Sequence, residues 1–562
     1  MSPRWMLSSM RQKPDVIVDA VYNIRGAGMG LCEVRARRCG MLLMLALGLS
    51  ACGGGSSGSM LSGSSGGAGS SPSGDGWVAG VYQPSAHFAA RCAMPRSGVD
   101  PTTNQTYPDV QGTTTDENNW LRSWTNELYL WYSEVPDIDP GTYSSTASYF
   151  QVMKTTATTS TGRPKDRFHF TYPTSTWEQM SQAGVDIGYG VTWDLAVSVP
   201  PRQAYAGFVW TGYSAQAAGV VRGAQILAID GVDMVNADDQ ASVNTLNQGL
   251  SPTTVGETHT FSLLDPGAST PHTVTLQAAA VTEAPVPVVT SLSTTSGPVG
   301  YILFNDHIAT AEAALINGIQ QLKTAGVTDL VLDIRYNGGG YLDIASELAY
   351  MIAGPVPTAG QPFDQIAFNS KYSSTNPVTG QALTPTPFHN VSQGFSSSPA
   401  SGTTLPYLAL PRVFVLTGPG TCSASEAVIN GLKGVNVQVI QIGSTTCGKP
   451  YGFYPQDNCG TTYFSIEFQG ENAQGFGNYP DGFSPQNSST LTSAVLPGCS
   501  VADDFTHQLG DPAEGRLAAA LGYRTAGACT VPASGLGPQA VQANKHQLVH
   551  GPLWRAIAIR AP

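Results

Sequence analysis

Charged side chains are scarce in this sequence. Of its 562 residues, 12% are Asp, Glu, Lys or Arg, and acidic residues outnumber basic ones, so that the formal net charge is −12. A protein that binds nucleic acid needs a basic face to neutralise phosphates. The composition therefore argues against a nucleic-acid partner and favours a protein that works outside the cytoplasm.

Zinc-binding spacings are absent as well. The sequence has no C-x-x-C pair and no H-E-x-x-H helix, which are the spacings that hold structural or catalytic zinc. We therefore expect no metal and no cofactor.

A hydrophobic run long enough to span a bilayer is also missing near the N-terminus. The apolar run at residues 41–49 is too short to cross a hydrocarbon core of about 30 Å as a helix. Three arginines precede it and small residues follow it, an arrangement typical of a secretory signal. The ending Leu49-Ser50-Ala51-Cys52 resembles a bacterial lipobox, which implies that Cys52 is lipidated and becomes the first mature residue. An ordinary signal peptide with an incidental cysteine is the alternative.

The predicted organisation of the N-terminal part follows from this signal. Residues 1–52 are the signal segment, with a start site that is either Met1 or, if the start lies further downstream, Met29 or Met41. Residues 53–77 are rich in Gly and Ser, cannot bury a core, and are predicted to be a flexible tether. The chain is thus expected in the cell envelope, held to a membrane by a lipid anchor.

Six of the nine cysteines lie beyond the signal segment, and an even number permits disulfides in an exported protein. The sequence alone does not choose among their pairings. Cys447 and Cys459 flank a short loop, so we take this pair as one expected disulfide. The other four cysteines are Cys92, Cys422, Cys499 and Cys529.

Residues 78–182 are predicted to form a mainly helical region. Trp120, Trp124 and Leu128 recur at helical spacing, which is typical of a helix that packs against a core. Thr114 and Glu117 stand three apart and are predicted to form its capping box.

Residues 183–284 read as short strands separated by turns, with a tight Asp230-Gly231 turn after an apolar strand. The segment resembles a PDZ domain, and a generic small β-rich domain is the alternative. PDZ domains add a peptide to a sheet edge and hold its carboxylate with backbone N–H groups. The resemblance places that peptide-binding segment at Ile187, Gly188, Tyr189, Gly190 and Val191.

Residues 290–530 alternate between apolar strands and amphipathic helices, which predicts an α/β layer with a partly parallel sheet. Residues 531–562 are a C-terminal tail without a clear pattern. The fold class as a whole is therefore α/β within an α+β multidomain chain: a helical N-terminal region, a PDZ-like β domain and an α/β core.

Ser423 stands between the strand at 412–417 and the helix that starts near residue 425. Free N–H groups at a helix start favour developing negative charge, but a serine nucleophile also needs a base. Lys449 follows the next strand, at 436–443, so the two side chains could emerge at one end of the sheet. A lysine in a dry pocket has a lowered pKa and accepts a proton.

Three motifs, "LVLDIRYNGGGYL" (330–342), "TCSASEAVINGL" (421–432) and "IGSTTCGKP" (442–450), occur in this order after the PDZ-like segment. Together they resemble the C-terminal processing proteases of serine peptidase family S41, over roughly residues 116–523. The resemblance implies an α/β core of the ClpP/crotonase-like type and polypeptide substrates. It also implies a dyad of Ser423 as nucleophile and Lys449 as general base.

The same resemblance implies roles for the residues around the dyad. Backbone N–H groups of Ala424 and of Gly340, with Gly339 as the alternative, would form the oxyanion hole. Glu426 would assist the dyad, unless it only stabilises the helix dipole. Some relatives carry a glutamine four residues after the lysine, where this chain has Phe453, so another group must orient the lysine.

The sequence therefore predicts an exported serine endopeptidase that captures polypeptides through a PDZ-like domain. The main alternative is a peptide-binding lipoprotein on an inactive peptidase scaffold. A hydrolase of esters or glycans on the same scaffold, and a Cys422 nucleophile, are weaker alternatives.

Overall fold

The computed structural model describes residues 76–101, 104–396 and 398–529. The predicted signal segment with Cys52, nearly all of the predicted tether and the C-terminal tail lie outside the described residues. Within the described ranges, no helix has both the length and the apolar character needed to cross a membrane. The mixed helix-and-sheet, multidomain architecture predicted from the sequence is confirmed.

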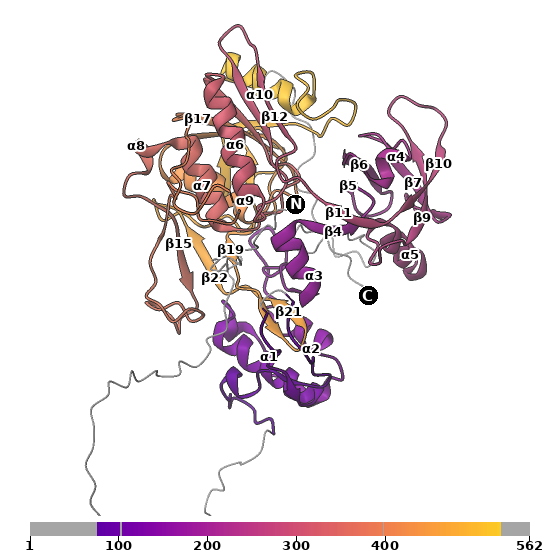
Figure 1. Cartoon of the computed structure of the whole chain (residues 1–562), viewed down its shortest axis with the longest axis vertical. Helices are drawn as coiled ribbons and strands as arrows, with labels where there is room; N and C mark the ends of the chain where they lie inside the picture. The colour runs from indigo at the N-terminus through magenta and orange to yellow at the C-terminus, as the bar shows by residue number, and fades with distance from the viewer. Residues whose placement is uncertain (1–75, 102–103, 397, 530–562) are drawn as a thin grey trace, which may run out of the picture.

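The helical N-terminal region lies at the bottom of Figure 1 and packs around α1 (Thr114–Leu128). Trp120 and Trp124 stack with ring centroids 5.1 Å apart, and both are buried. The aromatic residues of α1 therefore form a core, as their spacing predicts. The region also contains α2 (Thr146–Val152), α3 (Thr174–Glu178) and the short strands β1 (Arg91–Cys92) and β2 (Val110–Gln111).

The predicted capping box of α1 is wrong by one residue. Thr113 is the N-cap: its extended backbone ends the preceding segment, its Oγ1 accepts from the Asp116 N–H at 3.1 Å, and its own N–H donates to Asp116 Oδ2 at 2.8 Å. Glu117 instead accepts a hydrogen bond from the Ala93 N–H. The pattern T-T-T at 113–115 offers several candidate caps, and the tertiary contact of Glu117 decides among them.

The N-terminal region is joined to a hairpin that comes almost 300 residues later. Strand β3 (Phe170–Pro173) pairs antiparallel with β21 (Thr461–Phe464), which pairs in turn with β20 (Gln456–Asn458). A disulfide between Cys92 and Cys459 joins the same two parts covalently.

The predicted Cys447–Cys459 disulfide is therefore wrong. Cys459 lies at the tip of the β20–β21 hairpin and is carried to Cys92, whereas Cys447 pairs with Cys422. A third disulfide joins Cys499 and Cys529. Proximity in sequence misled the prediction because strand pairing with the N-terminal region brings distant cysteines together.

Residues 185–282, which we call the β-lobe, lie at the right of the molecule in Figure 1. Their main sheet has the strand order β10-β9-β7-β6-β5, with β8 paired to β7, and a two-stranded ribbon of β4 and β11 leads in and out. Helix α5 (Gln240–Leu250) and the short α4 (Ser214–Ala217) pack on it. The strands are β4 (Val185–Gly188), β5 (Val191–Val197), β6 (Gln203–Val209), β7 (Gln225–Ile229), β8 (Val232–Asp233), β9 (Thr258–Leu264), β10 (His272–Gln277) and β11 (Ala279–Thr282).

The core sheet has the order β12-β13-β14-β17-β18-β25. Strand β12 is antiparallel to its neighbour, and the remaining strands are parallel, as the alternation of strands and helices predicts. The strands are β12 (Val288–Leu292), β13 (Val299–Leu303), β14 (Asp329–Asp333), β17 (Arg412–Thr417), β18 (Gln438–Gly443) and β25 (Gly498–Ser500).

Helices cover both faces of this sheet. Leu330 and Leu332 of β14 pack with helices α6, α7 and α9 on one face, while Val331 between them packs with α10 on the other. Burial on both faces explains why β14 is continuously apolar. The helices are α6 (Ala311–Thr324), α7 (Leu342–Ala353), α9 (Ala424–Gly434) and α10 (Gly515–Ala526).

A second, smaller sheet has the order β16-β15-β22-β19 and extends below the core in Figure 1. Its strands are β15 (Pro362–Phe368), β16 (Thr386–Pro387), β19 (Tyr451–Gly452) and β22 (Phe468–Glu471). Strand β19 directly follows the Gly448-Lys449-Pro450 segment. Pairing of β19 in this sheet therefore holds the backbone on the C-terminal side of Lys449 in place. The short α8 (Pro355–Thr358) and the parallel pair β23 (Phe483–Pro485) and β24 (Ala494–Leu496) complete the core.

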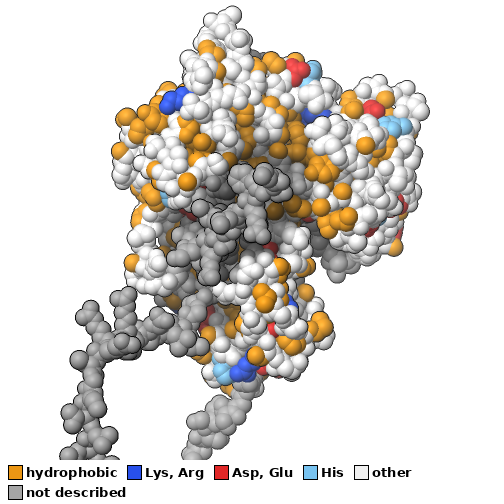
Figure 2. Space-filling model, viewed as in Figure 1, with side chains coloured by type: hydrophobic (Ala, Val, Ile, Leu, Met, Phe, Trp, Pro, Cys, Tyr) orange, Lys and Arg blue, Asp and Glu red, His pale blue; other side chains and the backbone are white. Residues whose placement is uncertain are grey.

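The β-lobe touches the core through Arg222. Its guanidinium donates to Asp503 Oδ1 at 2.9 Å and to the Tyr336 hydroxyl at 2.9 Å. Tyr336 is the first residue of the turn 336–340 after β14. On the face that Figure 2 shows, Lys and Arg side chains lie far apart and form no basic patch.

Candidate active site

Three neighbouring parallel strands of the core end at one place. The glycine turn follows β14, Ser423 follows β17 and Lys449 follows β18. In open α/β sheets, ligands bind outside the carboxyl ends of the strands. Ser423, Lys449 and Gly340 indeed line one pocket, together with Trp177, Ser181, His307, Ile308, Gly338, Tyr341 and Phe453.

Ser423 has a strained backbone. Its φ of 55° and ψ of −118° lie in a region that costs a non-glycine residue about 1–3 kcal/mol. It is the N-cap of α9, so the turn from β17 into the helix is sharp and the hydroxyl is partly exposed. This strained turn between strand and helix is the geometry in which hydrolases present a serine nucleophile.

Lys449 is buried, with 5% of its surface exposed. Its Nζ lies 3.9 Å from the ring centroid of Phe453 and 5.3 Å from that of Phe168. Burial lowers the pKa of Lys449 from 10.5 to about 7, against the opposing charges of Asp166 and Glu426. A substantial fraction of the lysine is therefore a neutral amine at neutral pH, as a general base must be.

Phe453 lies against the amine of Lys449. The ring helps to bury the amine, and burial lowers the pKa of Lys449, while the attraction between an ammonium and a ring face opposes that shift. Packing against this ring helps to position the amine.

Glu426 lies in the first turn of α9 and joins the serine turn to the lysine loop, by which we mean residues 444–449. Its carboxylate accepts from the backbone N–H groups of Ser423 at 3.2 Å, Gly448 at 2.9 Å and Lys449 at 2.8 Å. The Thr446 hydroxyl donates to it at 2.5 Å. Burial raises the pKa of Glu426, and these donors oppose the rise. Glu426 therefore holds the backbone of both loops.

The structure distinguishes the two glycines considered for the oxyanion hole. The Gly339 N–H donates to Asn337 Oδ1 at 2.9 Å, so it is already used. Within the described part of the chain, no hydrogen bond uses the N–H of Gly340 or of Ala424. Of the backbone N–H groups considered for the oxyanion hole, these two are therefore the ones left to donate to another group.

Gly339 and Gly340 are required as glycines by their backbone and by close packing. Their φ values are +102° and +132°. A Cβ on Gly339 would lie 2.8 Å from Ser423 Cβ, and one on Gly340 would lie 2.4 Å from the His307 carbonyl oxygen. The turn therefore packs directly against Ser423.

Two groups in or near the site were not identified from the sequence. His307 follows β13 and lines the pocket; its Nδ1 lies 3.0 Å from Asn337 Oδ1, and burial lowers its pKa to about 3, so it is neutral. Arg167 donates to the Cys447 carbonyl at 2.8 Å and so ties the N-terminal region to the lysine loop. A polar residue just after an apolar strand is the sequence signal that would have marked His307.

The predicted peptide-binding residues lie elsewhere. Residues 187–191 belong to the β-lobe, and none of them lines the pocket. Tyr189 is buried and its hydroxyl donates to the Gly249 carbonyl at 2.9 Å. The structure thus brings together the predicted catalytic residues and keeps the predicted peptide-binding segment separate from them.

Comparisons with known proteins show which family and which fold this chain is similar to. The model of peptidase family S41 matches residues 298–452, and that of the S41 N-terminal domain matches residues 116–172. A putative S41 protease from Bacteroides fragilis shares the fold, with a TM-score of 0.51 and 22% identity, over 74% of this chain and 97% of that one. The α/β core and the N-terminal region are thus similar to the corresponding parts of peptidase family S41. The solved structure shows that the fold is shared as well.

Within that family the chain is similar to carboxyl-terminal-processing proteases. The one from Picosynechococcus sp. is 28% identical over 279 residues, which are 49% of this chain and 56% of that protein. The one from Synechocystis sp. is 26% identical over 239 residues, 42% of this chain and 47% of that protein. The chain thus spans about half the length of the curated relatives it matches.

The glycine turn yields a first prediction. In Gly340→Ala the new Cβ meets the His307 carbonyl, so the turn shifts and its N–H leaves the oxyanion position. We expect the rate at which a fluorophosphonate labels Ser423 to fall by about 100-fold, the usual effect of losing one oxyanion donor. Gly380→Ala is the control, because Gly380 also has a positive φ, +70°, but in open space. Equal labelling rates in the two variants would contradict the assignment.

Proposed function

We propose that this protein is an exported serine endopeptidase in which Ser423 attacks the scissile carbonyl and Lys449 is the general base. The observation that carries the proposal is a lysine buried to 5% exposure in the same pocket as a serine held at the strained start of a helix. Among the described residues Lys449 has no salt bridge within 4 Å, and the charges of Asp166 and Glu426 only partly offset the cost of keeping a buried amine charged. A role as base for the serine explains why a lysine is placed there.

The residues support a two-step hydrolysis. The neutral amine of Lys449 accepts the proton of Ser423 Oγ as the oxygen bonds to the carbonyl carbon. The N–H groups of Ala424 and Gly340 donate to the developing oxyanion, at the positive end of the α9 dipole. Protonated Lys449 then gives its proton to the leaving amine. In the second step Lys449 accepts a proton from a water molecule whose oxygen bonds to the acyl carbon. Lys449 then returns that proton to Ser423 Oγ as the ester bond breaks and the acid is released.

We further propose that the β-lobe captures a polypeptide end in the manner of a PDZ domain. Strand β5 is the last strand of its sheet, so one edge is open to an added strand within the described part of the chain. The carbonyls of Tyr189 and Gly190 accept from Ala215 and Trp210, and no hydrogen bond in the described residues uses the N–H of either. Gly190 has a φ of +76°, which turns these N–H groups together.

An envelope location with a lipid anchor on Cys52 completes the proposal. The lipobox-like sequence supports it, and three disulfides among the described residues suit an oxidising compartment.

The catalytic assignment is tested by substitution. Ser423→Ala and Lys449→Ala should each lower kcat for a peptide substrate by at least about 10³-fold, because one removes the nucleophile and the other its base. Melting temperatures close to that of the wild type would show that folding is intact. Near-normal hydrolysis in the folded Lys449→Ala protein would refute the dyad. Wild-type protein that binds peptides without cleaving them would favour the binding-protein alternative.

The pH dependence gives an independent test. The base must be neutral, and Lys449 has a pKa of about 7, so kcat/KM should rise with pH, with its midpoint near 7 and a plateau above about 8. An acid limb near 10, where an exposed lysine titrates, would contradict a buried base. His307 does not produce the limb, because its pKa lies near 3.

The proposed capture site is tested by comparing peptides that differ only at the C-terminus. A peptide with a free C-terminal carboxylate should bind the Ser423→Ala protein at least about 10-fold more tightly than the same peptide amidated, because N–H groups bind the charged end. Fluorescence polarisation measures both affinities. Equal affinities would show that the β-lobe does not recognise a carboxylate.

A further inference from the structure

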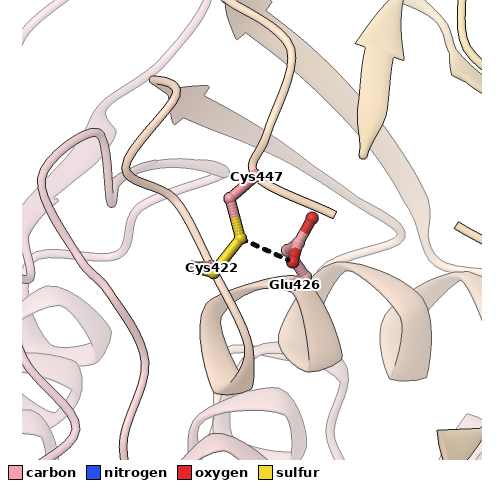
Figure 3. A group of neighbouring side chains, drawn as sticks. All are labelled: Cys422, Glu426 and Cys447. Atoms are coloured by element: carbon pink, nitrogen blue, oxygen red, sulfur yellow. Dashed lines mark hydrogen bonds between the residues drawn. A yellow bond between two sulfur atoms is a disulfide. The ribbon is translucent and has the colours of Figure 1, made fainter. Parts of the chain in front are cut away.

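A disulfide joins the two halves of the proposed dyad. Cys422 immediately precedes Ser423, and Cys447 lies two residues before Lys449. Figure 3 shows the bond running from the turn before α9 to the lysine loop, with Glu426 pointing toward it from the first turn of α9. The bond is buried, with Cys422 exposed by 1% and Cys447 by 7%.

We propose that the Cys422–Cys447 disulfide positions Ser423 against Lys449, so that the protein hydrolyses peptides efficiently only when this pair of cysteines is oxidised. The inference rests on the proposed peptidase function and adds a covalent requirement to it.

The contacts of the lysine loop show what the disulfide adds. Besides Glu426, the contacts of the loop include the Cys447 N–H, which donates to the Thr421 carbonyl at 2.9 Å, and Arg167 on the Cys447 carbonyl. The N–H groups of Ser444 and Thr446 also donate, to the carbonyls of Thr417 and Phe483. Each of these contacts is a hydrogen bond that water can replace once the loops separate. The disulfide keeps the Cα atoms of Cys422 and Cys447 5.2 Å apart and prevents that separation.

The geometry of proton transfer makes this restraint matter for catalysis. The position of Ser423 Oγ follows from the backbone at 422–423, and that of Lys449 Nζ follows from the backbone at 447–449. A displacement of about 1 Å between reacting groups lowers a rate by about 10²-fold. Loosening one loop against the other therefore affects kcat before it affects substrate binding, since the β-lobe is not part of either loop.

A metal site is the other interpretation of this cluster. The sulfurs of Cys422 and Cys447 and a carboxylate oxygen of Glu426 lie within 4.8 Å of one another. Thiolates are the sulfur ligands of zinc, however, and sulfurs joined in a disulfide carry no such charge. Glu426 also uses its oxygens for the N–H groups of three residues. The 3.5 Å approach of Cys447 Sγ to Glu426 is a contact, because a disulfide sulfur has no proton to donate.

Formation of the Cys422–Cys447 disulfide from two thiols requires an oxidant. The two thiols lose two protons and two electrons, which pass to a disulfide oxidant that becomes a dithiol, through a mixed disulfide. Oxidising compartments outside the cytoplasm supply such oxidants, and the cytoplasm keeps thiols reduced. A chain that is still in the cytoplasm is then nearly inactive toward the proteins around it.

Two matched variants test the proposal. The first is Cys422→Ala with Cys447→Ala; the second is Cys499→Ala with Cys529→Ala. The two disulfides close segments of similar length, with sequence separations of 25 and 30, so loop closure predicts a similar loss of stability from each. In the full-length protein, we expect kcat to fall about 10- to 100-fold in the first variant, with KM within about threefold of wild type. The second should keep the wild-type kcat.

The pH profile separates positioning from general stability. Water that enters beside a loosened lysine loop raises the pKa of Lys449 toward its usual value. The acid limb of kcat/KM should therefore move to higher pH in the first variant and stay in place in the second. A wild-type kcat in the first variant, or equal losses in both, would overturn the proposal. A wild-type protein that fails to hydrolyse any peptide would instead count against the peptidase function itself.

Reduction of the wild-type protein gives a second measurement that needs no substitution. Dithiothreitol is oxidised to its cyclic disulfide as a protein disulfide becomes two thiols. Mass spectrometry of alkylated peptides then gives the reduced fraction of each of the three pairs. Activity should follow the Cys422–Cys447 pair and return on reoxidation. Activity that follows another pair, or none, would refute the role of this bond.

Discussion

The burial of one amine is the constraint on which the rest of the site depends. Lys449 lies between aromatic rings, away from water, and this environment keeps a large share of it neutral near pH 7. An exposed lysine in the same place would be charged and unable to accept a proton. The rings of Phe168 and Phe453 are thus part of the proposed chemistry, although neither ring takes part in a proton transfer.

The groups that surround this amine come from several different elements of the core. Parallel strands deliver the serine, the lysine and the glycine turn to one edge, and Glu426 fastens the serine turn to the lysine loop through backbone N–H groups. The β-lobe reaches the glycine turn through Arg222 and Tyr336. The β-lobe and the glycine turn are therefore connected by a short chain of contacts.

The sequence was sufficient to predict features that depend on the order of strands and helices along the chain. Alternating strands and helices predicted the parallel sheet, and the positions of Ser423 and Lys449 after successive strands predicted a shared edge. Prediction from the sequence failed where contacts between segments far apart in the chain determine the structure. The partner of Cys459 depends on the pairing of strand β21 with β3. Glu117 accepts from the distant Ala93 N–H instead of capping α1, and the side chain of Asn337 accepts the Gly339 N–H.

The pairing of β3 with β21 also has a consequence for when the protein becomes functional. Phe168 and Arg167 come just before β3, yet they complete the surroundings of a lysine some 280 residues later. Contacts of such high sequence separation can form only once all of the intervening chain has been synthesised. During synthesis the N-terminal region must therefore wait for nearly the whole core to leave the ribosome, and a truncated nascent chain lacks a dry pocket for its lysine.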